Sequence, residues 1–397
     1  MSFDMPLTTG PQRFGSVIST YLLPLGWIAI LTGIFWAWDR SVYHKLFYIF
    51  LALPTLLALI LQPRLLPALT KNPLFIVFFV FSGYMLLTLA WSDGDNSIGS
   101  LIKRPLYIAM LLFSAGIIVL RCPDYLEKGT WLAAIFAALA AGVSLIYFKF
   151  FETSSTGRLS GYGALYNPLL SAHVFGAFAA FWLASWFQAR RALSPLPILC
   201  IAILGAAILA TGSRTPLIGL AAAFAWLLIV GNSRRSLIGC GVIAVALISI
   251  ALTYPEAFTQ RGLSYRPAIW VESLRQIGEH PWLGHGFDTP MTVIIPGLAK
   301  TLADPHNIEL GVLYSGGIVG LTLWLTLYGL AIYFSWVHRK HAMVTLAATW
   351  LVFGFASGLT EGNAFMSRPK EHWYLIWIPM ALVYAQSLIY WTRKRAV

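Results

Sequence analysis

Charged side chains are scarce in this 397-residue chain, and their scarcity decides its class. Asp, Glu, Lys and Arg make up 11% of the sequence, whereas hydrophobic residues make up 58%. A water-soluble globular domain carries about 25% charged residues, so the composition excludes that class. We expect an all-helical, polytopic integral membrane protein, because apolar runs of the length of a transmembrane helix recur along the chain.

Cysteines and acidic residues are also few. The sequence has three cysteines, and 15 Asp and Glu residues against 27 Lys and Arg residues. Cys122 is expected in a cytoplasmic loop, and Cys200 and Cys240 are expected within spans, so no external disulfide is predicted. A cleavable signal peptide is not evident either, because the first apolar run is long and lacks a small-residue cleavage site.

About twelve apolar runs can cross a hydrocarbon core of roughly 30 Å, and residues 1–397 are predicted to form a single membrane domain. The runs cover approximately residues 16–37, 45–61, 73–91, 105–120, 129–150, 168–187, 195–211, 215–231, 236–253, 307–336, 342–360 and 372–391. One long polar interval, 254–306, separates the ninth run from the tenth. It is predicted to contain an amphipathic helix over about 267–279 that lies on the membrane surface.

Basic residues predict the orientation, since loops rich in Lys and Arg stay in the cytoplasm. With both termini inside, the cytoplasmic segments hold fourteen of the 27 Lys and Arg residues, but only Asp4, Asp124 and Glu127 of the 15 acidic residues. The net charge of +12 is therefore explained by topology and does not indicate binding to nucleic acid. The long interval is placed outside.

Several basic residues in the external loops run against this preference and need an explanation. They are Lys103, Arg104, Arg158, Arg214 and Arg266. The helix N-termini expected beside most of them carry partial positive charge, so together they form a candidate cradle for a polyanion such as a diphosphate. Loop flexibility is the alternative for Arg158, and an interfacial side chain is the alternative for Arg214.

A polar residue followed by proline marks most of the expected helix starts on the outer face. Proline suits a helix N-terminus because the N–H group that it lacks has no partner there. The pairs are Arg104-Pro105, Asn167-Pro168, Thr215-Pro216, Arg266-Pro267, Asp304-Pro305 and, shortly before the last span, Arg368-Pro369.

His306 is the candidate general base. Asp304 is predicted to cap a helix that begins at Pro305, which places the imidazole in the first turn of the tenth span. The positive helix end disfavours a charged imidazole, so a neutral histidine able to accept a proton is expected near pH 7. Asn307 and Glu309 are placed to orient it. The alternative is a histidine that only caps its helix.

These motifs resemble the signature of the O-antigen ligase and polymerase superfamily. The resemblance rests on Ser213-Arg214 heading a membrane helix, on Arg266 with Trp270 followed by PWLGHGF, and on His306-Asn307 before a glycine-rich span. The stretch RLSGYGALYNP also resembles a loop of the family, and the similarity covers residues from about 80 to 330.

The resemblance implies a bacterial inner-membrane glycosyltransferase with a periplasmic active site. Such an enzyme takes a glycan from undecaprenyl diphosphate, and in the ligases the acceptor is lipid A-core oligosaccharide. Matching the motifs makes Arg214 and Arg266 the essential arginines and His306 the essential histidine. Membrane lipid is the remaining partner, and no nucleic acid is expected.

The residues are consistent with that chemistry. His306 would take the proton of an acceptor hydroxyl, while Arg214 and Arg266 would stabilise the leaving diphosphate without a metal or cofactor. Lys103, Arg104, Arg158 and Asn307 are expected to bind substrate. Direct attack by a single base-activated hydroxyl predicts inversion at the anomeric carbon.

Three alternatives stay open. A metal-dependent glycosyltransferase would use Asp93 and Asp95 with a divalent cation. A polymerase of repeat units, or a protein O-oligosaccharyltransferase, would share the donor site with a ligase and differ in the acceptor; length and the compact loop favour a ligase. A twelve-span transporter is the distant alternative, because the sequence shows neither midplane charges nor two similar halves.

Overall fold

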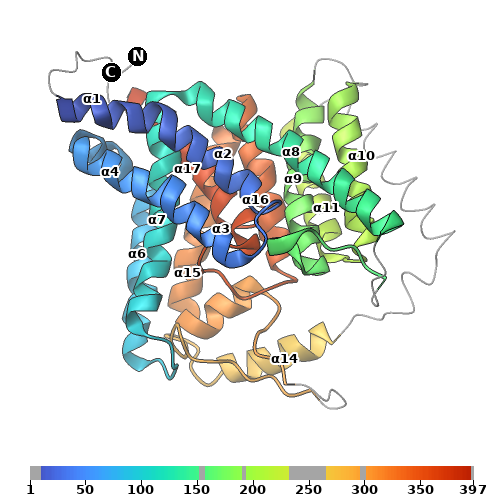
Figure 1. The fold of residues 1–397 in the computed structure, drawn as a ribbon. Helices are drawn as coiled ribbons and strands as arrows, with labels where there is room; N and C mark the ends of the chain where they lie inside the picture. The colour runs from blue at the N-terminus through green and yellow to red at the C-terminus, as the bar shows by residue number, and fades with distance from the viewer. Residues whose placement is uncertain (1–9, 152–156, 190–193, 232–264, 296–300, 395–397) are drawn as a thin grey trace.

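The structure is a computed structural model, and it describes residues 10–151, 157–189, 194–231, 265–295 and 301–394. Every regular element in these ranges is a helix (Figure 1), apart from an isolated bridge between Val293 and Leu302. Eight helical segments are long and apolar enough to cross a membrane. The prediction of an all-helical, polytopic membrane protein is therefore confirmed.

The described residues form α-helices together with short 3-10 and π-helical segments. In chain order they are α1 (Gly10–Val17), η1 (Ile18–Leu22), α2 (Leu23–Gly33), α3 (Arg40–Phe47), η2 (Tyr48–Ala52), α4 (Leu53–Leu61), η3 (Pro63–Leu65), α5 (Leu66–Thr70), α6 (Pro73–Leu87), η4 (Thr88–Trp91), α7 (Ile98–Arg121), α8 (Pro123–Phe150), η5 (Gly163–Leu165), α9 (Pro168–Gln188), α10 (Pro195–Ala210), α11 (Thr215–Gly231), α14 (Arg266–Ile277), α15 (Ile308–Val337), α16 (Ala342–Gly358), η6 (Glu371–Tyr374) and α17 (Trp377–Lys394).

Three of the predicted spans correspond to shorter apolar helices, α10, α11 and α16. The predicted ninth span, 236–253, lies outside the described residues, as does 254–264 of the long polar interval. The expected total of about twelve spans therefore stays a prediction.

The most central helices are those that lead to the site described below. The span Pro168–Gln188 is 78% buried and Glu371–Trp391 is 83% buried, whereas Pro123–Phe150 is only 28% buried. Inside this centre the indole of Trp350 donates a hydrogen bond to the carbonyl of Tyr374 over 2.7 Å, and Phe178 contacts both rings. Aromatic packing thus ties α9, α16 and η6 together.

The ends of the helices gather on two opposite faces. On one face Asn72 donates to Ser387 over 2.9 Å. On the other face, Asn96 donates to Asp288 over 2.7 Å. We call this second face the site face: it carries the loops 92–97, 281–295 and 359–370 together with α14, which Figure 1 shows at the opposite end of the bundle from α1.

The long helix α15 is broken at Gly317, where φ is +61° and ψ is −164°. The loop 281–286 fills the break and takes up the backbone groups that it frees. Ile318 N donates to Pro281 O over 2.8 Å, and His285 N donates to Tyr314 O over 2.8 Å. A Cβ on residue 317 would lie 2.3 Å from Trp282 O, so only glycine fits. The motif PWLGHGF and the paired glycines of the tenth span therefore form one structural unit.

Three of the polar–proline pairs begin helices as predicted, since α11 starts at Thr215 and Pro216 in the same way as α9 and α14 start at theirs. Asp304-Pro305 and Arg104-Pro105 do not, and α15 begins only at Ile308. The side chain of Asn167 caps α9, which starts at Pro168, and α14 starts at Arg266 and Pro267. Pro105, however, lies inside α7, which already begins at Ile98. The prediction of a helix N-terminus at Arg104 is wrong, because the preceding polar residues continue the helix outward.

The amphipathic helix, predicted over about 267–279, is α14, and it packs against protein. Ile269 and Ile277 are buried in a small cluster with Met291 and Val293. Arg275 points away from this cluster and pairs on the surface with Glu272 and Glu279. The helix thereby carries Arg266, at its first residue, to the edge of the bundle.

We expect Gly317→Ala to destabilise the protein. The backbone conformation alone costs about 1–3 kcal/mol for a residue with a side chain, and the clash with Trp282 O adds to it. Thermal unfolding in detergent measures the effect. Gly329→Ala is the matched control, because a Cβ there would meet nothing within 4 Å and alanine is the better helix former. Equal midpoints for the two variants would contradict the argument.

Candidate active site

A buried carboxylate, Glu361, is the centre of the polar cluster on the site face. Glu361 is 5% exposed and lies just after α16. Arg266 Nη2 donates to one carboxylate oxygen over 3.1 Å, and His306 Nδ1 lies 3.3 Å from the other. A buried charge is stable only with such partners, so Glu361 holds two of the predicted site residues together.

Ionisation of Glu361 is favoured by these neighbours. Burial opposes the charged form, but the hydrogen bond from His306 and the positive charges of His306 and Arg266 lower the pKa of the Glu361 carboxyl below its usual range. The carboxylate is therefore an acceptor at neutral pH, and Nδ1 of His306 carries the hydrogen that it accepts.

The position of His306 corrects the prediction. The helix α15 begins at Ile308, with Asn307 as its cap, so the imidazole does not lie in a first helical turn. His306 instead has φ of +47°, a left-handed conformation uncommon for a residue with a side chain. The backbone N–H of His306 donates to Asp304 Oδ1 over 2.9 Å, which helps to hold this conformation. Such strain is typical of functional sites.

The pKa of His306 is shifted in the direction opposite to the one expected from a helix terminus. The hydrogen bond to Glu361 is the largest influence and raises the pKa of the imidazole; burial lowers it less, and the charge of Asp304 adds to the rise. The helix terminus expected to lower the pKa is not where the histidine lies. The carboxylate of Glu361, in direct contact with the ring, instead determines the direction of the shift.

Of the two residues expected to orient His306, the structure places Asn307 in a scaffold role. Its side chain accepts from Leu310 N over 2.9 Å and donates to Leu359 O over 2.9 Å. This bridge ties the start of α15 to the segment that leads into Glu361. No contact between Glu309 and His306 is present among the described residues.

Arg214 follows a tight turn in which Gly212 has φ of +64°. Its side chain is exposed, with no partner in the described ranges. The next residue, Thr215, contacts His173 Nε2 over 2.8 Å. His173 is buried on α9 and close enough to Glu361 and Arg266 for their charges to act on it. The Arg214 turn is thus connected to the neighbourhood of Glu361 through His173.

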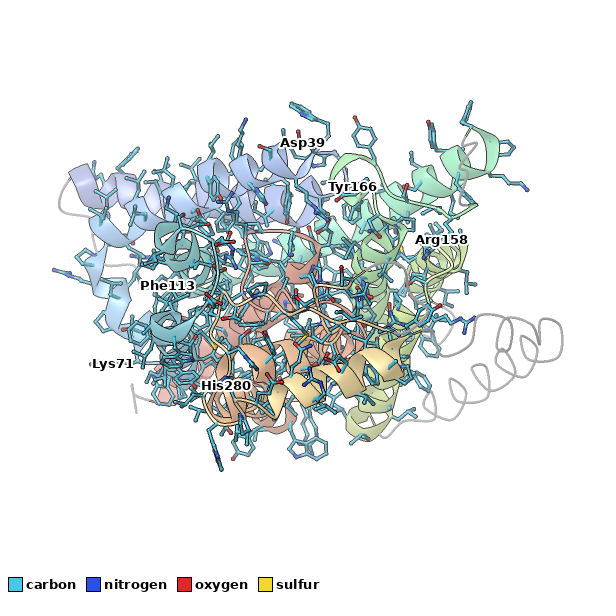
Figure 2. All side chains as sticks on the ribbon, turned by 90° about the horizontal axis from the view of Figure 1, so that it is seen from below. Asp39, Lys71, Phe113, Arg158, Tyr166 and His280 are labelled. Carbon is cyan, nitrogen blue, oxygen red and sulfur yellow. The ribbon has the colours of Figure 1, made fainter. Side chains whose placement is uncertain are left out.

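The other predicted substrate-binding residues fall in three different settings. Arg158 Nε donates to Thr211 O over 2.7 Å and so supports the turn before Arg214. Figure 2 shows it beside the green helices, away from His280 in the loop after α14. Lys103 is exposed. Arg104 is half-buried against the ring of Phe287, with 5.5 Å from its guanidinium carbon to the ring centroid.

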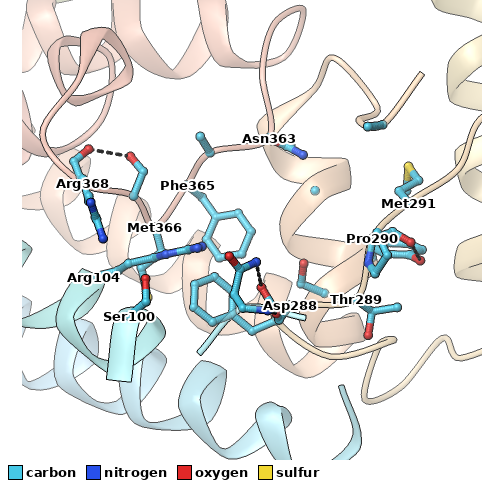
Figure 3. Close-up of a pocket in the computed structure, with 18 of the residues that line it drawn as sticks. Ser100, Arg104, Asp288, Thr289, Pro290, Met291, Asn363, Phe365, Met366 and Arg368 are labelled. Carbon is cyan, nitrogen blue, oxygen red and sulfur yellow. Dashed lines mark hydrogen bonds between the residues drawn. The ribbon is translucent and has the colours of Figure 1, made fainter. Parts of the chain in front are cut away.

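A cavity lies beside the Glu361 cluster. Its volume is about 610 Å³, and Pro305 and Asn363, which flank the cluster in sequence, both line it. Figure 3 shows Arg104 and Arg368 on one side of this cavity and Thr289 and Pro290 across it. A volume of this size accommodates a sugar-sized ligand.

The sequence patterns did not indicate Glu361 as a site residue, because its partners lie far away in the sequence. It stands in SGLTEGNAF, at the outer end of the eleventh predicted span. The available signal was a lone acidic residue between two apolar helices on the face already rich in arginines. For the metal-dependent alternative, Asp93 and Asp95 have no third ligand of the usual kinds gathered with them in the described residues.

Two comparisons with known proteins found matches to this chain. A family model described as O-antigen ligase matches residues 198–325, an interval that includes Arg214, Arg266 and His306 and ends before Glu361. A curated O-antigen ligase from Pseudomonas aeruginosa strain PAO1 is 58% identical over 369 residues, which cover 93% of this chain and 91% of that protein.

We expect Glu361→Gln to lower the pKa of His306. The substitution keeps a hydrogen-bond acceptor of the same shape but removes the negative charge that raises the pKa, so the pKa should fall. Titration of histidine ring signals by NMR measures it, with the His306 signal assigned by its loss in a His306→Gln variant.

Glu272→Gln is the matched control for that titration. It removes an equivalent carboxylate on α14 that pairs with the exposed Arg275 and touches no histidine. An unchanged His306 titration in Glu361→Gln would show that the carboxylate does not govern the imidazole.

Proposed function

Because the chain belongs to the O-antigen ligase family, we propose that it is an O-antigen ligase that transfers a glycan from undecaprenyl diphosphate to lipid A-core oligosaccharide. The reaction would take place at the periplasmic face of the bacterial inner membrane, with both termini in the cytoplasm. The observation that carries the proposal is the bridge by which Glu361 holds His306 and Arg266 side by side.

His306 would be the general base. Its Nδ1 is occupied by Glu361, which leaves Nε2 free to accept the proton of an acceptor hydroxyl. Glu361 would hold the ring in this tautomer and stabilise the imidazolium that forms, as the carboxylate of a Ser-His-Asp triad does. The raised pKa of His306 makes it a stronger base, at the cost of needing a higher pH to be neutral.

Arg266 and Arg214 would stabilise the leaving group. As the acceptor oxygen bonds to the anomeric carbon, the bond from that carbon to the diphosphate breaks and its electron pair goes to the diphosphate oxygen. Arg266 gives Glu361 only Nη2, so its other nitrogens remain available to the diphosphate. Arg214 is free in solvent-exposed space and would complete the clamp.

Inversion at the anomeric carbon follows from this arrangement. Both oxygens of Glu361 are engaged, one by Arg266 and one by His306. A carboxylate held in this way supports a base and is a poor covalent nucleophile. A single displacement, without a metal, is therefore the proposed course of the reaction.

We expect His306→Ala to lower the rate of transfer by about 10²–10⁴-fold, the usual contribution of a general base. Purified protein is incubated with undecaprenyl-diphosphate glycan and lipid A-core, and the product is followed on gels. His280→Ala is the matched control, since this histidine lies on the same face but outside the cluster. Full activity of His306→Ala would remove the base assignment.

The same assay separates a ligase from its relatives in the superfamily. The donor is offered in turn with lipid A-core, with a second donor molecule, and with an acceptor protein. Transfer to lipid A-core alone supports the proposal. Extension of the second donor, or glycosylation of the protein, with none to lipid A-core would replace it by a polymerase or a protein O-oligosaccharyltransferase.

A further inference from the structure

The cavity beside the Glu361 cluster contains more positive charge than its own residues neutralise. Its lining includes Arg40, Arg104, Arg368 and Lys370 from three separate segments. Of these, only Arg40 has a carboxylate partner among the described residues: its Nη2 lies 2.8 Å from Glu371.

One further carboxylate lines the cavity, that of Asp288. It accepts from Asn96 Nδ2 over 2.7 Å and from Asn96 N over 2.9 Å, and it acts on Arg104 at longer range. Three cations, Arg104, Arg368 and Lys370, therefore face one carboxylate. The excess of two positive charges is left for a ligand to compensate.

The environment of the cavity affects the pKa of Lys370. Burial lowers the pKa of its ammonium group, and the positive charges of Arg40 and Arg104 lower it further, although the carboxylates of Glu371 and Asp304 act in the opposite direction. Half-buried cations that repel one another are unfavourable in an empty cavity, and a bound anion reverses the sign of the interaction. Figure 3 shows Arg104 and Arg368 on the same side of the cavity, where one anion can meet both.

The position of the cavity relative to the base indicates which substrate it takes. Pro305 precedes His306 directly, and Asn363 lies two residues after Glu361; both line the cavity, whereas Arg266 and Arg214 do not. In a single displacement the attacking oxygen and the leaving group lie on opposite sides of the anomeric carbon. If Arg266 and Arg214 hold the leaving diphosphate, the cavity is left to the acceptor.

We propose that this cavity binds the acceptor glycan through a phosphate group on its sugars, held between Arg104 and Arg368 with Lys370 beside them. Guanidinium groups suit this task because their paired N–H donors match two phosphate oxygens at once. The inference rests on the proposed function, and it adds a selection for acidic acceptors that the base and the diphosphate clamp do not provide.

The test measures binding and turnover separately. The full-length protein in detergent is titrated with lipid A-core that carries its phosphates, and with the same acceptor after treatment with phosphatase. Arg368→Gln is the main variant, since its exposed side chain in a loop is not needed for folding; Arg104→Gln is the second. Arg275→Gln, on the outer surface of α14, is the matched control. Thermal unfolding shows which variants are folded.

We expect the phosphorylated acceptor to bind about tenfold more weakly to Arg368→Gln and to Arg104→Gln, and no change in Arg275→Gln. In the transfer assay the KM for the acceptor should rise by a similar factor, with kcat and the KM for the donor unchanged. Phosphatase treatment should weaken wild-type binding to the level of the variants and affect the variants little.

Other outcomes overturn the inference. If Arg368→Gln and Arg104→Gln lost binding equally for the phosphatase-treated and the untreated acceptor, the arginines would not recognise phosphate. A rise in the KM for the donor instead would assign the cavity to the lipid diphosphate. Absence of transfer by the wild type, with selective binding of the phosphorylated acceptor intact, would refute the proposed function and leave the cavity assignment standing.

Discussion

The buried carboxylate of Glu361 is the interaction on which the site depends. It joins α14, the approach to α15 and the segment after α16, because Arg266, His306 and Glu361 come from these three elements. A buried negative charge in this position is stable only while both Arg266 and His306 are present. Removing either partner leaves the charge of Glu361 incompletely compensated. The same electrostatic contacts that stabilise the buried carboxylate therefore also align His306 with Arg266.

The backbone around this cluster is unusually well specified. The break in α15 at Gly317 receives the loop 281–286, and the bridge from Asn307 to Leu359 joins two helix ends. His306, between these fixed points, keeps a left-handed conformation that an isolated chain would avoid. Placing a base on such a framework holds its geometry more closely than a flexible loop would.

Basic residues of the site face belong to two groups, one at the Glu361 cluster and the Arg214 turn and one in the cavity. Arg266 is partly neutralised by Glu361, and Arg214 stands at the turn before α11. Arg104, Arg368 and Lys370 line the cavity. A transfer reaction needs recognition on both sides of the bond that is exchanged, and a mechanism without a metal must provide it with side chains. In the proposed reaction, this need accounts for basic residues that run against the topological preference.

The sequence by itself determined the features that depend on composition and on neighbouring residues. These are the helical membrane class, the cap at Asn167, the start of α14 at Arg266 and the motifs that indicated the family. Tertiary structure alone decided the rest. Glu361 meets His306 across 55 positions of the chain, so no local pattern revealed the pair, and the pKa of His306 was misjudged because its argument assumed a helix starting at Pro305. Pro105 entered a helix for a similar reason, since residues further out extended it. Caps and apolar periodicity act within a turn or two, whereas charges act through space on whatever the fold brings near.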